Sequence, residues 1–208
     1  AINPYLVEGK KTVALEIAEQ LGFAVPDWVV VSVGDGCTIA GVGKGFADFH
    51  RLGLITGVPK LLGVQSSGCN PFVKAAAENR ELEPAEENTI ADSIAVGIPR
   101  NPVKALRAVE DSLGSWIEVA DTEIIKAMKL LGRTEGIFAE PAASAALAGL
   151  IKAYDTGLIG RDETVVCIST GNGLKDTANA LKAAAEPVLL KNDIDKLNEY
   201  LKEKKEIQ

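Results

Sequence analysis

A glycine-rich loop at residues 33–41 carries the first group of residues whose types and spacing suggest chemistry. It reads Val-Gly-Asp-Gly-Cys-Thr-Ile-Ala-Gly and joins a predicted buried strand to a predicted helix. The free N–H groups and the dipole at a helix start attract phosphate. Gly34 and Gly36 let the backbone approach an anion, Thr38 can donate a hydroxyl hydrogen bond, and Asp35 is expected to point away. A tight strand-to-helix turn without a ligand is the alternative interpretation.

The two common nucleotide-binding fingerprints do not fit this loop. Ile39 stands where a dinucleotide-binding loop needs its third glycine, and the next predicted strand ends in Gln65 instead of a ribose-binding acid. A Walker A loop fails because Thr38 replaces its first glycine and Gly45 its Ser or Thr. The sequence therefore disfavours a nucleotide-dependent enzyme.

A second loop, 169–176, reads Ser-Thr-Gly-Asn-Gly-Leu-Lys-Asp, and it also follows a predicted buried strand and opens a helix. In a parallel sheet such loops lie at one edge, beyond the carboxyl ends of the strands. We therefore expect the two loops to lie together and to form one site.

Histidine and cysteine offer little further chemistry. His50 is the sole histidine, and no G-x-S-x-G elbow supports a hydrolase, so a structural role is expected. Cys37 is interpreted as a small residue that fits the turn. With Cys69 and Cys167 it makes an odd, widely spaced set, which suits neither a disulfide framework nor a zinc site. No metal site is predicted.

The elements that must position the two loops alternate along the chain. Strands are predicted at 28–33, 60–65, 116–119 and 163–169, and helices at 9–21, 39–52, 71–80, from 103 onward, 121–135, 142–154 and 192–206. Asp121 is expected to cap its helix, and 81–87 to form an acidic surface loop. This order predicts an α/β fold: a parallel twisted sheet with helices on both faces.

Composition limits the partners of this 208-residue chain. With 47% apolar residues it can form one main domain, and a net charge of −7 disfavours nucleic acid and anionic membranes. No apolar run approaches the roughly 20 residues that span a bilayer, so a soluble, cytoplasmic protein is expected. Residues 1–185 are predicted to form the ligand-binding domain and 186–208 a C-terminal docking helix.

The second loop also resembles a family signature. Thr-Gly-Asn-Gly-Leu-Lys-Asp at 170–176 is similar to the string near the end of threonine synthases, which are pyridoxal-phosphate (PLP) enzymes of the tryptophan-synthase β fold, fold type II. Blocks similar to that family's occur in order before it, at 3–4, 8–12, 33–36 and 135–142. The resemblance extends to about Leu181, and it implies the C-terminal part of the large domain of such an enzyme.

The resemblance implies roles for several residues. Residues Gly34, Asp35, Gly36, Cys37 and Thr38 would hold the cofactor phosphate. Thr170 would place its hydroxyl against the pyridine nitrogen, and because a neutral hydroxyl does not enforce ring protonation, elimination and replacement are favoured over transamination. Glu140 would lie near the cofactor, with a carboxylate at a helix start as its alternative role.

The sequence departs from the family at two points. The Schiff-base lysine belongs to a Ser-Phe-Lys-type segment in the family's N-terminal half, and none of Lys10, Lys11, Lys44 and Lys175 stands in that context. No catalytic residue is therefore predicted here, and the chain alone is expected to be inactive without a missing N-terminal half.

The second departure is Leu6, which stands at a position where threonine synthases commonly carry a phosphate-binding arginine. The resemblance implies a lyase that converts O-phosphohomoserine to threonine and phosphate, a homodimer when full length. Leu6 keeps open a threonine/serine dehydratase-like or cysteate synthase-like enzyme, and the absent lysine keeps open a non-catalytic oligomerisation module.

Overall fold

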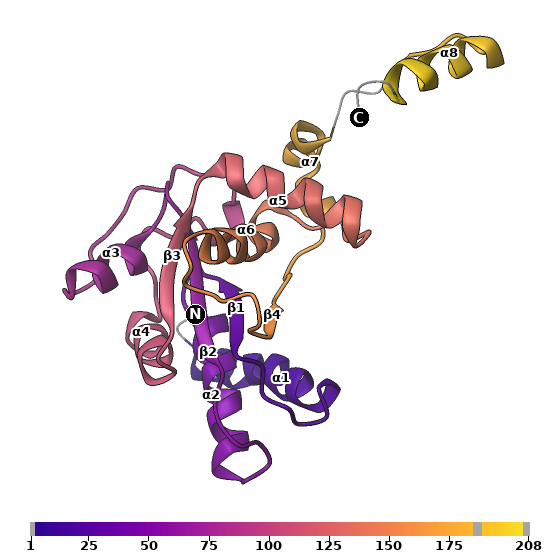
Figure 1. The fold of residues 1–208 in the computed structure, drawn as a ribbon. Helices are drawn as coiled ribbons and strands as arrows, with labels where there is room; N and C mark the ends of the chain where they lie inside the picture. The colour runs from indigo at the N-terminus through magenta and orange to yellow at the C-terminus, as the bar shows by residue number, and fades with distance from the viewer. Residues whose placement is uncertain (1–2, 185–188, 206–208) are drawn as a thin grey trace.

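The architecture is a four-stranded parallel sheet with helices on both faces, as predicted. The computed structural model describes residues 3–184 and 189–205. The strands are β1 (Trp28–Ser32), β2 (Lys60–Ser66), β3 (Ser115–Val119) and β4 (Val165–Cys167), in the spatial order β3-β2-β1-β4 (Figure 1). The strands pair in parallel, and Trp28 lies opposite Lys60 on one side and Val165 on the other. The carboxyl ends of all four strands therefore lie at one edge of the sheet.

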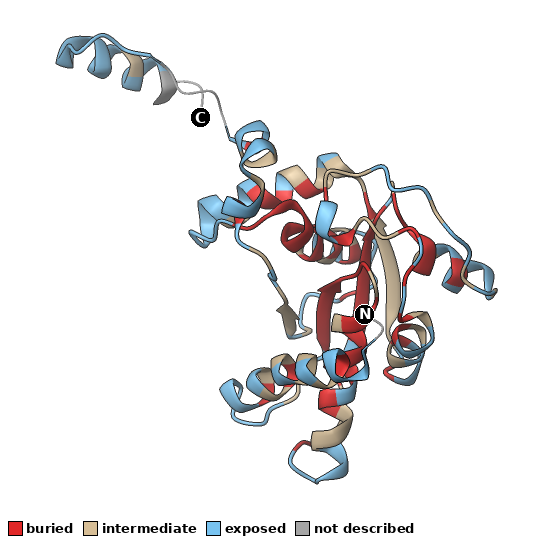
Figure 2. Ribbon diagram, turned by 180° about the vertical axis from the view of Figure 1, so that it is seen from behind, coloured by how far each residue is buried: buried red, intermediate tan, exposed pale blue. Residues whose placement is uncertain are grey.

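Helices cover both faces of the sheet because successive side chains along each strand point to opposite faces. Val29 and Val31 face a core shared with α1 (Pro4–Gln20), α2 (Cys37–Arg51), α3 (Pro71–Glu78) and α4 (Pro102–Asp111). Val30 faces the opposite core, which α5 (Asp121–Thr134) and α6 (Pro141–Asp155) complete. Figure 2 shows β1, β2 and α6 as the most continuously buried part of the molecule.

The fourth strand corrects one expectation. The prediction gave a buried strand over 163–169, but β4 comprises three residues, all of intermediate exposure (Figure 2). Among the described residues it pairs only with β1, so its other edge has no sheet neighbour there. The apolar run Val165–Ile168 favours a buried strand, but the position of a strand within the sheet decides how much of such a run is covered.

Two helix starts also differ from the prediction. The first helix begins at Pro4, with the Asn3 side chain accepting from the Tyr5 N–H at 3.0 Å, because proline suits the first helical turn. Asp121 is the first residue of α5 and Ala120 its N-cap, so the cap was predicted one residue late. The Glu123 carboxylate accepts from the Ala120 N–H at 2.6 Å and completes this helix start.

The Asp121 carboxylate instead holds a loop. It accepts from the Thr89 hydroxyl at 2.6 Å and from the Ile90 N–H at 3.0 Å. These bonds anchor the segment between α3 and α4, which includes the predicted acidic loop and a short 3-10 turn, η1 (Asp92–Ile94). That turn brings Ser93 to the carboxyl edge of the sheet.

The chain ends in small helices. A 3-10 turn η2 (Gly173–Asp176) leads into α7 (Thr177–Ala183), and α8 (Ile194–Lys205) stands apart from the sheet in Figure 1. The predicted C-terminal helix is thus present, its docking role stays a prediction, and residues 186–188 and 206–208 lie outside the described part. Over the described residues, none of the helices has the length and apolarity to cross a bilayer.

Candidate cofactor site

The loop after β1 has the backbone geometry of an anion cradle at the start of α2. Gly36 is the N-cap of α2 with φ +86°, and its carbonyl accepts the first helical bond, from Ala40 N, at 3.2 Å. The N–H groups of Thr38 and Ile39 precede that bond, and N–H groups in a first helical turn have no acceptor within the helix. Thr38 adds a hydroxyl within this turn. The sequence prediction of a cradle is therefore supported by backbone geometry.

Glycine is required at this cap for two reasons. Its φ is one that residues with a Cβ rarely adopt. A Cβ built on Gly36 would also lie 2.7 Å from Ala105 Cβ and 3.0 Å from the Phe72 ring. The loop is consequently pressed against α3 and α4, which fixes its position at the edge of the sheet.

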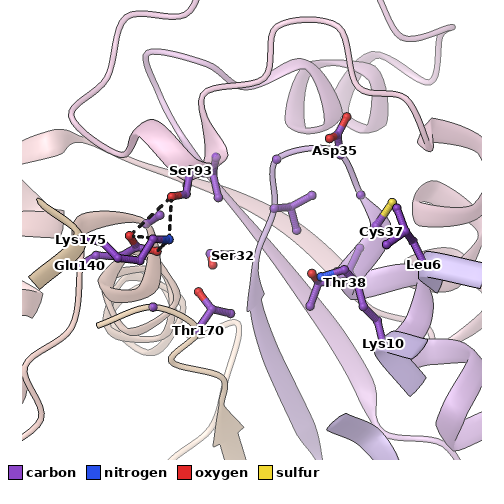
Figure 3. Close-up of a pocket in the computed structure, with 17 residues that line it drawn as sticks. Leu6, Lys10, Ser32, Asp35, Cys37, Thr38, Ser93, Glu140, Thr170 and Lys175 are labelled. Carbon is purple, nitrogen blue, oxygen red and sulfur yellow. Dashed lines mark hydrogen bonds and ion pairs between the residues drawn. The ribbon is translucent and has the colours of Figure 1, made fainter. Parts of the chain in front are cut away.

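The segment before α4 fixes the loop from the other side. The Asp35 carboxylate accepts from the Arg100 N–H at 3.0 Å, and the Asp35 carbonyl accepts from the Asn101 N–H at 3.1 Å. The Asn101 side chain donates to the Gly36 carbonyl at 3.4 Å. Asp35 thus points away from the centre of the site, as expected (Figure 3), while the supporting role of Asn101 gave no signal in the sequence.

Gln65, which argued against dinucleotide binding, has a structural role. Its buried side-chain oxygen accepts from the Phe72 N–H at 2.9 Å and the Val73 N–H at 3.2 Å. Its amide donates to the Val33 carbonyl at 3.4 Å. The side chain therefore ties the start of α3 to the end of β1, immediately before the cradle.

The loop after β4 reaches the same cavity. The Ile168 N–H donates to the Val30 carbonyl at 3.0 Å, so β4 leads the chain alongside β1 to the same edge. Thr170 and Gly171 line a cavity of about 330 Å³ together with every residue from Ser32 to Ile39. Ser32 and Thr170 lie between the cradle and the Glu140 side of this cavity (Figure 3). The expectation that both loops share one edge is confirmed.

Glu140 forms the opposite wall of the cavity. Its backbone N–H donates to the Gly171 carbonyl at 2.9 Å, and it is the N-cap of α6. Glu140 is 5% exposed, and its carboxylate lies 3.1 Å from Lys175 Nζ and 3.5 Å from the Ser93 hydroxyl (Figure 3). Its side chain makes no hydrogen bond to the helix start, so the contact with Lys175 defines its role. Sequence reasoning found Glu140 and missed Ser93.

Comparison with known proteins identifies the family to which these loops belong. Residues 1–171 match the pyridoxal-phosphate dependent enzyme family. The chain belongs to this family. It is 44% identical over 205 residues to the threonine synthase of Methanocaldococcus jannaschii, which covers 98% of this chain and 51% of that protein. The threonine synthase of Methanosarcina acetivorans is 46% identical, covering 97% of this chain and 50% of its own length. The chain therefore spans about half the length of these relatives.

Solved structures of the family share the fold. The processed form of threonine deaminase isoform 2 from Solanum lycopersicum superposes with a TM-score of 0.70 at 24% identity, covering 88% of this chain and 50% of that one. Serine racemase from Dictyostelium discoideum gives 0.65 at 22% identity, with coverage of 82% and 51%. The sheet and helices described above thus form part of a fold-type II pyridoxal-phosphate domain.

The residues present fit the phosphate and ring of this family's cofactor. The cradle offers a left-handed glycine and the first N–H groups of α2, a combination that binds phosphate. A cavity of about 330 Å³ is within the range of small-molecule sites. Across that cavity Thr170 offers one neutral hydroxyl, and the ring nitrogen of the cofactor needs one polar partner of this kind.

Other reactive side chains stay outside the chemistry. Burial raises the pKa of the Cys167 thiol to about 12, which keeps it protonated near neutral pH. His50 lies on α2 with Nδ1 3.2 Å from the Ile55 carbonyl, the structural role expected for it. Among residues 3–184 and 189–205, no group of three His, Cys, Asp or Glu side chains could hold a metal ion.

Proposed function

We propose that this chain is the cofactor-holding part of a threonine synthase, an enzyme that converts O-phosphohomoserine and water to threonine and phosphate. The observation that carries the proposal is the single cavity onto which the cradle and Thr170 both open. Threonine synthases at 44% and 46% identity over nearly the whole chain support the choice of reaction. Because the chain spans half of those proteins, it requires the complementary half as its partner.

Each residue has a defined task in this proposal. The N–H groups at the start of α2 and the Thr38 hydroxyl bind the cofactor phosphate, with Gly34 and Gly36 giving the backbone room to approach. The Thr170 hydroxyl bonds the ring nitrogen without adding a charge. Bound pyridoxal phosphate supplies an electron sink, which suits elimination and replacement at β or γ carbons.

Glu140 and Lys175 set the charge of the wall beside Thr170. Lys175 Nζ is engaged by the buried Glu140 carboxylate at 3.1 Å, and Lys175 stands outside the sequence context of the family's cofactor-binding lysine. Lys10 also lines the cavity, but it stands outside the sequence context of the family's cofactor-binding lysine. The nucleophilic lysine is therefore assigned to the other half of the enzyme, and this chain alone is expected to be inactive.

Leu6 favours a second candidate for the substrate. It lines the cavity at the position where a phosphate-binding arginine would stand, and a leucine cannot bind the phosphate of O-phosphohomoserine. A threonine/serine dehydratase-like or cysteate synthase-like reaction is the alternative. Supplying the complementary half as a separate chain and measuring phosphate release from O-phosphohomoserine distinguishes the two, because the alternative enzymes would release none.

Cofactor binding by the chain itself is the more direct test. Pyridoxal phosphate should shift the melting temperature and bind at least tenfold more tightly than pyridoxal, which lacks the phosphate. Borohydride treatment followed by peptide mass spectrometry should label none of the lysines.

Two variants distinguish the ring contact from a general loss of stability. Thr170→Val should change the absorbance of the bound cofactor and weaken its binding, whereas Thr12→Val, at an exposed site on α1, should do neither. A lysine labelled specifically in this chain would refute the assignment of the nucleophile. Absence of any affinity for pyridoxal phosphate would favour a non-catalytic oligomerisation module.

A further inference from the structure

A second cavity lies between α2 and α4, away from the cofactor site. It has a volume of about 490 Å³, and none of its lining residues also lines the cofactor cavity. Its floor is made of small residues, among them Ala40, Gly43 and Ala108. A Cβ on Gly43 would lie 3.0 Å from Ala108 Cβ, so the two helices touch at the floor of the groove and their longer side chains form its walls.

The walls of this groove are cationic. Lys44 and Arg51 on α2, with Lys104 and Arg107 on α4, line it together with the exposed His50. Two carboxylates also line it, those of Glu8 and Asp111. Positive charge is therefore in excess by two in the groove, whereas the whole chain carries a net charge of −7.

Among the described residues, the groove cations of α2 have carboxylate partners and those of α4 do not. Lys44 pairs with Glu8, and Arg51 lies 3.4 Å from Asp48. Lys104 and Arg107 form no ion pair with any residue in the described ranges. They lie three residues apart on α4, so both extend from the same side of that helix. Two adjacent cations without carboxylate partners repel each other unless an anion neutralises them.

We propose that this groove binds a small phosphorylated metabolite. A guanidinium group bonds phosphate through two parallel N–H groups, and a neighbouring ammonium adds a point charge. A phosphate ester matches the double excess of positive charge better than a monocarboxylate does. The small floor residues leave room for the organic part of the molecule. The site is separate from the cofactor phosphate cradle, so it binds a second ligand.

The test is a titration of the isotope-labelled chain with inorganic pyrophosphate, followed by the amide NMR shifts. Shifts should saturate and map to the second half of α2 and to α4. The double variant Lys104→Ala/Arg107→Ala should weaken this binding at least tenfold. Arg107→Lys should weaken it less, because lysine keeps the positive charge but loses the paired N–H groups of the guanidinium.

A pair of lysines with the same three-residue spacing on α5 provides a matched control. Lys126→Ala/Lys129→Ala removes two exposed cations from α5 and should leave pyrophosphate binding unchanged. Melting temperatures check that all variants fold. Non-saturating shifts, or equal weakening by both double variants, would overturn the proposal.

Shifts confined to residues 34–39 would also overturn the proposal, because the anion would then bind the cofactor cradle alone. That outcome would leave the proposed function intact, so the two hypotheses fail separately. The appearance of a saturable site for a large acidic peptide, with no response to pyrophosphate, would instead assign the groove to a protein partner and refute a metabolite site.

Discussion

Replacing Gly36 by alanine tests whether the cradle is fixed by both conformation and packing. At φ +86° an alanine costs about 1–2 kcal/mol through contact of Cβ with its own backbone. The new Cβ would also lie 2.7 Å from Ala105 Cβ, and such overpacking typically costs about 1–3 kcal/mol. We expect the free energy of unfolding to fall by about 3 kcal/mol, and the melting temperature by roughly 6–12 °C in a chain of this size.

Gly53→Ala isolates the conformational part of this effect. Gly53 has φ +71°, but a Cβ there meets no atom within 4 Å, so its replacement should cost only about 1–2 kcal/mol. Gly9→Ala, in open space inside α1, should stabilise the chain by up to about 1 kcal/mol. Urea unfolding of the three variants measures the differences. Equal losses at Gly36 and Gly53 would refute the claim that packing against α4 holds the cradle.

Three further predictions concern other parts of the molecule. Because burial raises the pKa of Cys167 to about 12, its thiol should react with a disulfide reagent at pH 8 only as the chain unfolds; rapid labelling of the native protein would contradict this. The Thr164 N–H and hydroxyl, which donate to the Asp27 carboxylate at 2.7 and 2.8 Å, lower the pKa of Asp27 below its usual 3.8. The resulting stabilisation is fully present above pH 3.8 and is lost as the pH falls through the lower pKa of the folded state. The melting temperature of the wild type should therefore fall more steeply below pH 4 than that of Asp27→Asn. Gly149→Ala, whose Cβ would lie 2.3 Å from a valine side chain of β2, should destabilise by about 1–3 kcal/mol, and Gly132→Ala, in open space on α5, should not destabilise at all.

Periodicity located nearly every element but misplaced several boundaries. The strand at 60–65 and the helix at 142–154 were each predicted to within one residue at both ends. The prediction for the first helix began five residues late, because the apolar spacing starts after the capped turn at Asn3. The last strand was predicted at more than twice its length, since a run of apolar residues does not reveal whether a neighbouring strand covers it.

The two loops were predictable as a site, and their supports were not. Glycine spacing after buried strands is a local signal, and parallel strands place such loops at one edge. The bonds from Arg100 and Asn101 to the cradle join residues 65 positions apart, and the contact of Ser93 with Glu140 joins residues 47 positions apart. Asparagine and serine in loops are too common for sequence alone to single out these two.

The sequence by itself determined the alternation of strands and helices, the parallel sheet, and the family to which the two loop motifs belong, because these depend on local patterns of residue type. Only the tertiary structure decided that Lys175 pairs with Glu140, that Gln65 ties α3 to β1, and that unpaired cations of α4 face α2 across a groove. Such pairings follow from the crossing of helices packed on a twisted sheet, which no short stretch of sequence encodes.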